Sequence, residues 1–355
     1  MKKHILSAAV TWLVGGCLVF GVETQTAPGW PEFHGTAREN RSPETGLLKR
    51  WPEGGPRLIW KYDDCGWGYS GVSVADVKIF TVGDDDGEQE DGKERLIALT
   101  LDGELVWKAA NGPSWTGSTP GSRTTPTFRD GVLYHLNPTG RLAALRAESG
   151  EEIWAVDLKK RFDARFGVWA LAENLVVEDD KVLCLPGGSK ALAAALDRRT
   201  GKTLWTTTGL ADKAAYCSPV VLTHNGVRQM ITMTDRSVIG VDVKTGKLLW
   251  HYPYPMNFPQ HATTPVCHEG HVFVACGHST GGTLLRIGPK SQSVEKVWHK
   301  QDFDNCHTSV ILLDGRLYGS GCRLGGKSFF CVDFLSGKTI AADNTLEKLS
   351  ITYAD

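Results

Sequence analysis

Short apolar runs separated by polar turns recur along most of the chain, and residues 124–156 show the pattern most clearly. Each run is only about five or six residues long, and it ends at a turn that contains Gly. Runs of this length are typical of β-strands and leave no room for long helices. The pattern therefore predicts a unit of four strands, at Thr124–Phe128, Val132–Leu136, Arg141–Arg146 and Glu152–Val156.

One phrase closes each such unit, and its clearest copy is Ala195–Trp205. After an apolar start comes Asp197, whose short carboxylate can accept hydrogen bonds from the N–H groups of a turn. Gly201 then supplies a backbone that tolerates positive φ. The phrase ends at Trp205, a large apolar ring that needs a surface to pack on. It predicts a strand, a tight turn and a second strand.

The phrase returns at nearly constant spacing. Close copies are Ala144–Trp154 and Gly240–Trp250; others are a shortened copy at Ala98–Trp107, a stretched one at Arg286–Trp298, one ending on Ala at Cys331–Ala341, and a tail at Trp60. Their closing positions are 60, 107, 154, 205, 250, 298 and 341. A period of roughly 40–50 residues with four short strands per unit is the signature of a β-propeller. We therefore predict an all-β propeller of four-stranded blades.

The repeats predict about seven visible blades, whose first strands begin near Ser70, Thr124, Leu175, Ser218, Thr264, Thr308 and Ser350. Leu58–Tyr62 is predicted as a strand, the fourth of a blade whose other strands are missing. Ser350–Asp355 repeats the start of a blade and then stops, which leaves an edge strand without a neighbour. We interpret the sequence as a fragment in which the propeller domain, residues 57–355, is truncated at its C-terminus and not closed.

The N-terminus combines a basic start with an apolar run over residues 1–22, which is typical of a secretory signal peptide. The run is also long enough to remain as a membrane anchor. The residues before Cys17 resemble a lipoprotein processing box, although the apolar run continues beyond it. Residues 23–56 predict an irregular arm, with Trp30 and Phe33 as aromatic anchors on the propeller. The chain is thus predicted to be exported to the periplasm or cell envelope.

Charge gives no reason to expect a nucleic acid partner. Lys and Arg number 39 and Asp and Glu 40, for a formal net charge of −1, whereas a nucleic-acid-binding surface needs an excess of basic residues. Hydrophobic residues make up 41% of the 355 positions, enough to bury the core of a single repeat array. Only the N-terminal segment is predicted to contact a membrane.

The cysteines leave two interpretations open. Cys322 and Cys331 flank a Gly-containing turn and could face each other across a hairpin, since export permits disulfides. Buried free thiols in strands are the interpretation that we prefer. No Cys-x-x-Cys pair occurs, so the sequence does not support a zinc or haem site.

The pattern Ala-x-Asp-x-x-Thr-Gly-x-x-x-Trp at Ala195–Trp205 resembles the tryptophan-docking motif of PQQ-like (quinoprotein-type) β-propeller repeats. Gly240–Trp250 matches it with Gly for Ala. The arm from Trp30 to Gly46 also resembles the N-terminal stretch of exported members. The resemblance covers Trp30–Asp355 and implies a fold shared with quinoprotein alcohol dehydrogenases and BamB-like outer-membrane assembly propellers. Members commonly have eight blades, which implies that one blade and part of another are absent here.

In that motif the Trp ring packs against the neighbouring blade and holds the fourth strand in place. The resemblance therefore implies structural docking roles, rather than ligand contacts, for Trp60, Trp107, Trp154, Trp205, Trp250 and Trp298.

The first strands of a propeller line its central axis, and the axial candidates of this chain are Thr124, Asn174, Ser218, Thr264, His307 and Thr308. They are mostly hydroxyl and small groups, and a calcium ion beside them would lack charged oxygen ligands. We interpret them as turn caps around a wet channel. Quinoprotein dehydrogenases of the family also carry a vicinal Cys-Cys pair beside the quinone, which this chain lacks. We therefore predict no catalytic residue, no bound PQQ and no calcium or other metal.

Three further clusters contain reactive residue types. The acidic stretch Asp84–Gly92 predicts a solvated hairpin loop, and a calcium site is the alternative. The loop is preferred because Arg95 stands where an EF-hand has its closing Glu. Cys306 and His307 are adjacent in a predicted strand, so that their side chains diverge and form no catalytic dyad. The histidines within residues 251–278 lack metal-ligand spacing.

The predicted function is that of an exported propeller that binds another protein or an envelope component through its faces and catalyses no reaction. A rigid disc can vary its loops without disturbing the contacts between its blades. The alternative is a PQQ-dependent alcohol dehydrogenase, either divergent or with its site outside this sequence. A polysaccharide-binding or lyase-type propeller has no paired acidic signature to support it.

Overall fold

The computed structural model describes residues 29–85, 92–256, 260–306, 309–321, 329–346 and 349–355. The predicted export segment, residues 1–22 with Cys17, lies outside these ranges, as do His307, Thr308 and Cys322. Within these ranges, no helix has both the length and the apolar character that a membrane crossing requires.

The described residues form six antiparallel sheets of four strands, and each sheet is a meander whose strands pair in chain order. The first three sheets consist of β2 (Ser73–Ala75), β3 (Lys78–Asp84), β4 (Lys93–Thr100) and β5 (Leu105–Pro113); β6 (Thr127–Arg129), β7 (Val132–Leu136), β8 (Arg141–Arg146) and β9 (Glu152–Asp157); and β10 (Val176–Glu178), β11 (Lys181–Cys184), β12 (Ala193–Asp197) and β13 (Thr203–Thr207). The other three consist of β14 (Val220–His224), β15 (Val227–Met233), β16 (Ser237–Asp242) and β17 (Leu248–Pro253); β18 (Val266–His268), β19 (His271–Cys276), β20 (Gly281–Ile287) and β21 (Val294–Lys300); and β22 (Ile311–Leu313), β23 (Arg316–Ser320), β24 (Phe329–Asp333) and β25 (Thr339–Asp343).

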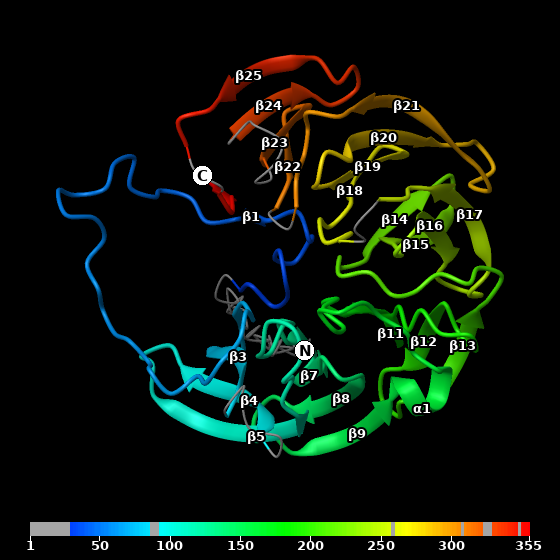
Figure 1. Cartoon of the computed structure of the whole chain (residues 1–355). Helices are drawn as coiled ribbons and strands as arrows, with labels where there is room; N and C mark the ends of the chain where they lie inside the picture. Colours follow the sequence, from blue (N-terminus) through cyan, green and yellow to red (C-terminus); the bar gives the residue numbers. More distant parts are fainter. Residues whose placement is uncertain (1–28, 86–91, 257–259, 307–308, 322–328, 347–348) are drawn as a thin grey trace, which may run out of the picture.

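These sheets are arranged as blades around a common centre, with the fourth strand of each blade on the outside (Figure 1). The arrangement confirms the predicted all-β propeller of four-stranded blades. In the second blade, β7 and β8 have the predicted boundaries. The described residues contain six complete blades rather than about seven.

The prediction of a strand at Leu58–Tyr62 was wrong, because this segment has an irregular backbone. A strand needs a neighbour for its backbone hydrogen bonds, and no strand within the described ranges pairs with these residues. Leu58 and Ile59 are accordingly 75% and 79% exposed.

The two ends of the described chain meet in a separate two-stranded sheet. β1 (Arg41–Ser42) pairs in parallel with β26 (Tyr353–Ala354), and Arg41 lies opposite Tyr353. The strand predicted to begin near Ser350 therefore pairs with the N-terminal arm. Figure 1 shows this pair beside the centre of the ring.

The apolar core lies between neighbouring blades. The largest cluster of buried residues includes Tyr134 of β7, Leu183 of β11 and Met230 of β15, which belong to three successive blades. Strand residues alternate between the two faces of a sheet, and both faces of an inner blade are covered. Blade-to-blade packing is thus continuous around the described part of the ring.

The connection after β9 begins with helix α1 (Leu158–Phe162). Asp157 caps this helix by accepting a hydrogen bond from the backbone N–H of Lys160. Leu158 and Phe162 are buried, so the helix is anchored on the blade behind it.

Most of the repeated tryptophans lie on the turn of the next blade. Trp205 illustrates the contact: its Nε1 donates to the carbonyl oxygen of Val243 at 2.9 Å, and its ring covers Gly246. A Cβ added to Gly246, whose φ is +75°, would lie 2.6 Å from Cε3 of the ring. The same pairing of ring and glycine joins Trp60 to Gly103, Trp107 to Gly150, Trp154 to Gly201 and Trp298 to Gly337.

The acidic residue of the phrase shapes the turn on which the ring lies. Asp197 Oδ1 accepts hydrogen bonds from the backbone N–H of Thr200 at 2.8 Å and from its hydroxyl at 2.7 Å. These bonds lower the pKa of the Asp197 carboxyl. Asp333 and Ser336 repeat the arrangement three copies further along the motif series. The Asp-x-x-Thr/Ser-Gly pattern is therefore a local turn signal.

Trp250 departs from this arrangement. Its Nε1 donates to Oε1 of Gln229 at 2.7 Å within its own blade, and its ring lies against Gly240. The next blade has the stretched copy of the phrase, in which Gly288 faces Ser293 rather than a tryptophan. The predicted docking of Trp250 on that turn is thus replaced by a contact with its own sheet.

This contact makes Gly240 a sensitive position, although other copies of the phrase have Ala there. A Cβ at Gly240 would lie 2.2 Å from Cε2 of Trp250. We expect Gly240→Ala to lower the free energy of unfolding by about 1–3 kcal/mol, the usual cost of overpacking. Chemical denaturation of the purified variant measures this change. A variant as stable as the parent chain would show that the ring does not lie on Gly240.

Candidate functional site at the centre of the propeller

The residues that precede the first strands link each blade to the next around the centre of the propeller, which we call the hub. Ser70 Oγ donates to the carbonyl oxygen of Thr124 at 2.8 Å, and the backbone N–H of Thr125 donates to Oδ1 of Asn174 at 2.6 Å. Asn174 Nδ2 donates in turn to Oγ of Ser218 at 2.8 Å. These bonds cross three successive blade boundaries.

The same kind of link continues around the ring. The backbone N–H of Tyr216 donates to the carbonyl oxygen of His261 at 3.0 Å, and Thr263 Oγ1 donates to Oδ1 of Asn305 at 2.6 Å. Residues engaged across blades in this way cannot also pair within their own sheet. The first strands therefore begin one to three residues later than predicted.

The structure places four of the six axial candidates in this ring. Thr124, Asn174, Ser218 and Thr264 are all at least 92% buried. Thr124 Oγ1 donates to the carbonyl oxygen of Leu136 at 2.7 Å, and Thr264 lines the hub cavity described below. His307 and Thr308 lie outside the described residues. The polar atoms of Asn174 and Ser218 are engaged with each other rather than directed at open space.

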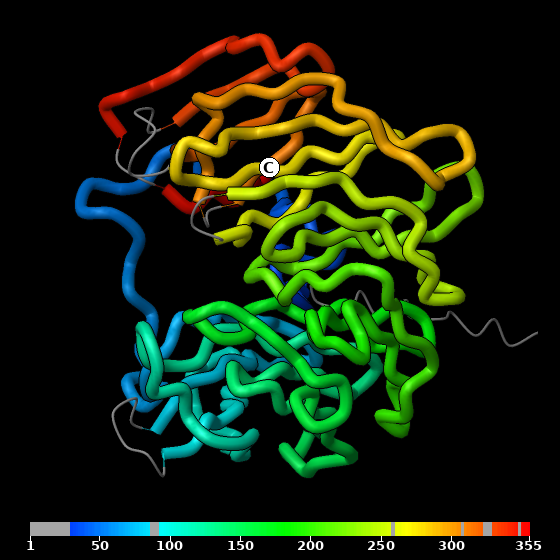
Figure 2. The backbone as a smooth tube through the Cα atoms, turned by 45° about the vertical axis from the view of Figure 1, so that its right-hand side comes forward, coloured from blue at the N-terminus to red at the C-terminus, as the bar shows by residue number. Residues whose placement is uncertain are grey.

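The N-terminal arm, residues 29–42, crosses the hub and contacts most blades in turn. Trp30 exchanges two backbone hydrogen bonds of 2.8 Å with Val74, and Pro31 accepts one from the N–H of Phe128. Asn40 Nδ2 donates to the carbonyl oxygen of Ile351. In the turned view of Figure 2, the dark blue arm is enclosed by the blades.

Arg38 is the central side chain of the arm. Its guanidinium forms a buried ion pair with Glu32, with Nη2 to Oε2 at 2.6 Å, and both side chains are less than 10% exposed. Nη1 also donates to the carbonyl oxygens of Asn174 at 3.3 Å and Pro219 at 3.1 Å, and Nη2 donates to that of Leu175. One guanidinium thus joins the arm to the third and fourth blades.

His34 contacts the opposite side of the ring, where its Nε2 lies 3.0 Å from Oγ of Ser309. Burial, together with the positive charge of Arg38, lowers the pKa of His34 to about 3. The imidazole is therefore neutral at physiological pH and adds no charge to the hub.

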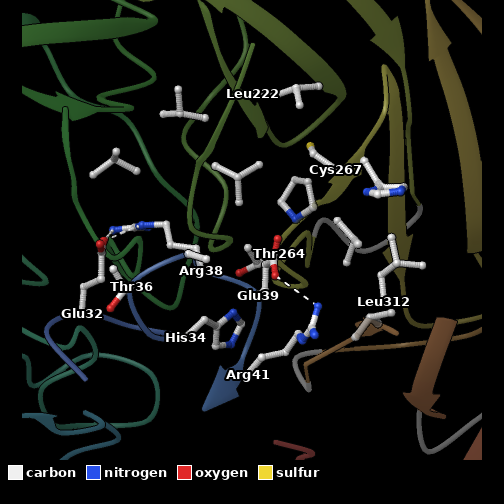
Figure 3. A pocket seen from close by; sticks show the side chains of 18 of the residues that line it. Glu32, His34, Thr36, Arg38, Glu39, Arg41, Leu222, Thr264, Cys267 and Leu312 are labelled. Atoms are coloured by element: carbon white, nitrogen blue, oxygen red, sulfur yellow. Dashed lines mark hydrogen bonds and ion pairs between the residues drawn. The ribbon is translucent and has the colours of Figure 1, made fainter. Parts of the chain in front are cut away.

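A cavity of about 570 Å³ lies between the arm and the first strands. Figure 3 shows Glu32, Arg38, Glu39 and Arg41 on its arm side, with Leu222 among the residues opposite. The arm contributes charge, whereas the strands contribute mainly aliphatic side chains.

The charged groups on the arm side of this cavity are paired with opposite charges. Arg41 lies 3.6 Å from Glu39, and Arg129 lies 3.6 Å from the same Glu32 that binds Arg38. Calcium requires free carboxylate oxygens and PQQ carries carboxylates that require free cations. These paired charges of the cavity do not fit either group. In the described ranges, no three or more His, Cys, Asp or Glu side chains gather in a way that could hold a metal ion.

The buried cysteines within the described ranges offer no accessible nucleophile. Cys306 is disulfide-bonded, so it is not the free thiol that we expected. Cys331 is free and buried, which contradicts a Cys322–Cys331 disulfide. Burial raises the pKa of Cys217 to about 11 and that of Cys184 well above the ordinary range, so both remain protonated thiols.

Glu173 is a buried acid at the hub that sequence reasoning missed. It is 2% exposed, and its Oε1 accepts a hydrogen bond of 2.7 Å from the backbone N–H of Leu185. Its Oε2 has no hydrogen-bond partner. Desolvation raises the pKa of this carboxyl from 4.5 to about 7, against the smaller opposing effects of the Leu185 bond and Arg38.

This shift predicts a pH dependence of stability. Between about pH 4.5 and pH 7, folded Glu173 holds a proton that the unfolded chain has released, so stability falls as the pH rises through this window. Glu173→Gln keeps the acceptor for Leu185 and removes the titration. Relative to this variant, we expect the parent chain to lose about 3 kcal/mol between pH 4 and pH 8. Denaturation curves of both proteins at several pH values measure the difference, and parallel pH profiles would contradict it.

Arg38 and Glu32 were also missed, because the carbonyl oxygens that Arg38 contacts lie more than a hundred residues away in the sequence. The only local signal was the presence of two opposite charges six residues apart in an otherwise irregular arm. The aromatic anchor Trp30 was predicted from composition, and it pairs with the backbone of β2.

The described residues form six four-stranded meander blades, and tryptophan rings cover the glycine turns of neighbouring blades. Together with the hydrogen bonds that link the blades at the hub, these features define a PQQ-like β-propeller repeat protein. Comparison with known families agrees with this class. The chain belongs to the family described as outer membrane protein assembly factor BamB, which matches residues 92–341.

Individual relatives are distant. The chain is 27% identical to outer membrane protein assembly factor BamB of Shewanella oneidensis over 191 residues, 52% of this chain and 45% of that protein. It is 28% identical to quinohemoprotein alcohol dehydrogenase ADH IIB of Pseudomonas putida over 146 residues, 38% and 20% of the two chains. The matched regions thus span less than half the length of these relatives.

The crystal structure of BamB from Moraxella catarrhalis aligns with a TM-score of 0.57. The alignment covers 83% of this chain and 79% of that chain at 19% identity. At this identity the likeness concerns the fold alone.

Proposed function

We propose that the chain is an exported β-propeller scaffold that binds a protein in the cell envelope and catalyses no reaction. The observation that carries the proposal is the occupied hub. Arg38 fills the position where the first strands converge, and the oxygens of Asn174 and Ser218 are used in links between blades. A hub of this kind holds the disc rigid and leaves its outer faces for binding.

The family description points to the class of partner. Two relatives bear the name of an outer membrane protein assembly factor. We propose that this chain likewise binds a component of the machinery that assembles outer membrane proteins, and that it lies in the periplasm or at the outer membrane. Lipid attachment through Cys17 remains part of this proposal.

The face that carries the long connection 159–174 is the one proposed to bind. Connections from a fourth strand to the next first strand lie at one face of the disc, and turns between third and fourth strands lie at the other. Val168, in the long connection, is 61% exposed, and Leu335, in the turn after β24, is 59% exposed. These two positions are therefore matched probes of the two faces.

A photo-crosslinking amino acid at Val168 or at Leu335, in cells of the native host, tests this proposal. We expect Val168 to crosslink to one envelope protein involved in outer membrane protein assembly, and Leu335 not to do so. Identical crosslinking patterns at both positions, or none at either, would contradict a defined binding face.

The enzymatic alternative has a separate test. Purified protein is incubated with PQQ and calcium and assayed for dye-linked oxidation of primary alcohols, with an authentic quinoprotein alcohol dehydrogenase as the positive control. We expect no turnover above the rate without protein. Measurable turnover would overturn the scaffold proposal even if crosslinking succeeded.

A further inference from the structure

Two acidic side chains are buried side by side in the first blade, away from the hub. Asp84 ends β3 and Glu94 lies in β4, and they are direct partners in the register of these antiparallel strands. Partners of this kind place their side chains on the same face of the sheet. Both residues are 0% exposed. Two adjacent carboxylates without access to water require either protons or a cation.

Each carboxylate has one oxygen bound and one oxygen free of any hydrogen-bond partner. Asp84 Oδ2 accepts a hydrogen bond of 3.0 Å from the backbone N–H of Trp115, and Glu94 Oε1 accepts one of 3.0 Å from Nδ2 of Asn137. Asp84 Oδ1 and Glu94 Oε2 have no partner. A third buried oxygen, Oγ of Ser114, is equally unpartnered.

The backbone places Ser114 next to both acids. Ser114 directly precedes Trp115, whose N–H binds Asp84. Asn137, which binds Glu94, also donates to the carbonyl oxygen of Pro113 at 3.0 Å. The residues on both sides of the Ser114 hydroxyl thus take part in the contacts of the two acids.

The neighbouring histidine does not neutralise the pair. His135 Nδ1 lies 3.4 Å from Glu94 Oε1, but it is 2.9 Å from Nδ2 of Asn111, a donor. The amide is oriented this way because Oδ1 of Asn111 accepts a hydrogen bond of 2.5 Å from Arg141. His135 Nδ1 is therefore an acceptor, the imidazole is neutral, and burial lowers its pKa to about 3.

Arg123 supplies one positive charge near this pair. It lowers the pKa of Asp84 through its charge, its Nη2 donates to the carbonyl oxygens of Ser118 and Thr119, and its Nε has no hydrogen-bond partner. Burial outweighs this effect and raises the pKa of Asp84 to about 6 and that of Glu94 well above its usual range. The ionised pair therefore needs a further positive charge.

We propose that Asp84, Glu94 and Ser114 form a calcium site between the first and second blades. Calcium prefers carboxylate and neutral oxygen ligands and tolerates irregular geometry, with water or carbonyl oxygens completing its shell. Asp84 Oδ1, Glu94 Oε2 and Ser114 Oγ supply two charged ligands and one neutral one. Because Asn137 and Ser114 belong to different blades, the ion would strengthen the boundary between them.

Terbium binding and calcium-dependent stability test the site. Tb³⁺ replaces Ca²⁺ at oxygen sites, and the tryptophan next to Ser114 can sensitise its emission. We expect saturable Tb³⁺ emission in the parent protein, competed by Ca²⁺, and a thermal midpoint that rises with calcium over that in EGTA. Glu94→Gln and Asp84→Asn should bind at least about tenfold more weakly and lose the calcium-dependent shift.

Glu173→Gln is the matched control, because Glu173 is also a buried acid with a free oxygen but precedes β10 and is not paired with a second acid in a strand register. It should bind Tb³⁺ like the parent protein. Glu94→Gln keeps the acceptor for Asn137 and removes a buried charge, so it is expected to fold in EGTA. Equal Tb³⁺ binding by the parent and Glu94→Gln proteins, or no calcium-dependent shift in the parent, would show that the pair is held by protons or water and would overturn the proposal.

Discussion

Trp205→Ala is expected to lower the free energy of unfolding by about 3–5 kcal/mol, as other truncations of buried aromatic side chains do. The ring is 9% exposed, and it covers Gly246 in the next blade. Its removal opens a cavity at the blade boundary and leaves the carbonyl oxygen of Val243 without its donor. Chemical denaturation followed by circular dichroism measures the change.

The chain contains its own control for this experiment. Trp51 is 68% exposed, and Trp51→Ala should change the free energy of unfolding by less than about 0.5 kcal/mol. Gly246→Ala disturbs the same contact from the side of the turn and should also lower stability. The new Cβ would overlap the Trp205 ring, and the φ of +75° is unfavourable for Ala. The docking role of Trp205 is refuted if the Trp205 and Trp51 variants are equally stable.

Arg38→Ala is expected to cost about 3–5 kcal/mol, because it leaves the buried carboxylate of Glu32 without its main partner. It also deprives the carbonyl oxygens of Asn174 and Pro219 of a donor. We expect the arm to detach from the hub, which would lower the thermal midpoint and make residues 29–42 sensitive to proteolysis.

Arg41→Ala provides the comparison for Arg38. Arg41 also belongs to the arm and lies 3.6 Å from Glu39, but both side chains of that pair are more than 40% exposed. Exposed pairs contribute about 0–1 kcal/mol. If the two variants behaved alike in proteolysis and in thermal melting, Arg38 would not be the residue that holds the arm.

The repeated phrase was predictable because it is local. Asp197, Thr200 and Gly201 form their turn within a few residues, so that each copy in the sequence indicates the same turn and the same pair of strands. The spacing of the copies then predicts the blades. The predicted strand boundaries were wrong where residues form hydrogen bonds to another blade, as they do before β6 and β10. No local sequence pattern indicates such a partner.

The hub was less predictable for the same reason. Arg38 donates to carbonyl oxygens 136 and 181 residues further along the chain, and nothing in the arm itself indicates them. Because the path of the arm across the hub could not be predicted, the axial hydroxyl groups were interpreted as turn caps around a wet channel. Trp250 is intermediate, because Gly240 in place of Ala was visible in the sequence, while its consequence for the ring required the packing.

Buried acids were the remaining difficulty. From the sequence, Asp84 was predicted to belong to a solvated acidic hairpin loop. Glu94 looks like an ordinary polar residue at the start of a strand. The structure separates them from the exposed acids by their register and burial. Residues 86–91 of that hairpin lie outside the described ranges.

The central claim is that the arm closes the hub, and amide hydrogen exchange of residues 29–42 tests it most directly. The backbone N–H groups of Trp30, Arg38 and Asn40 are hydrogen-bonded. We therefore predict that this segment exchanges as slowly as β16, the third strand of the fourth blade. Exchange as fast as that of the irregular, exposed residues 57–62 would show that the arm lies free and the hub is open.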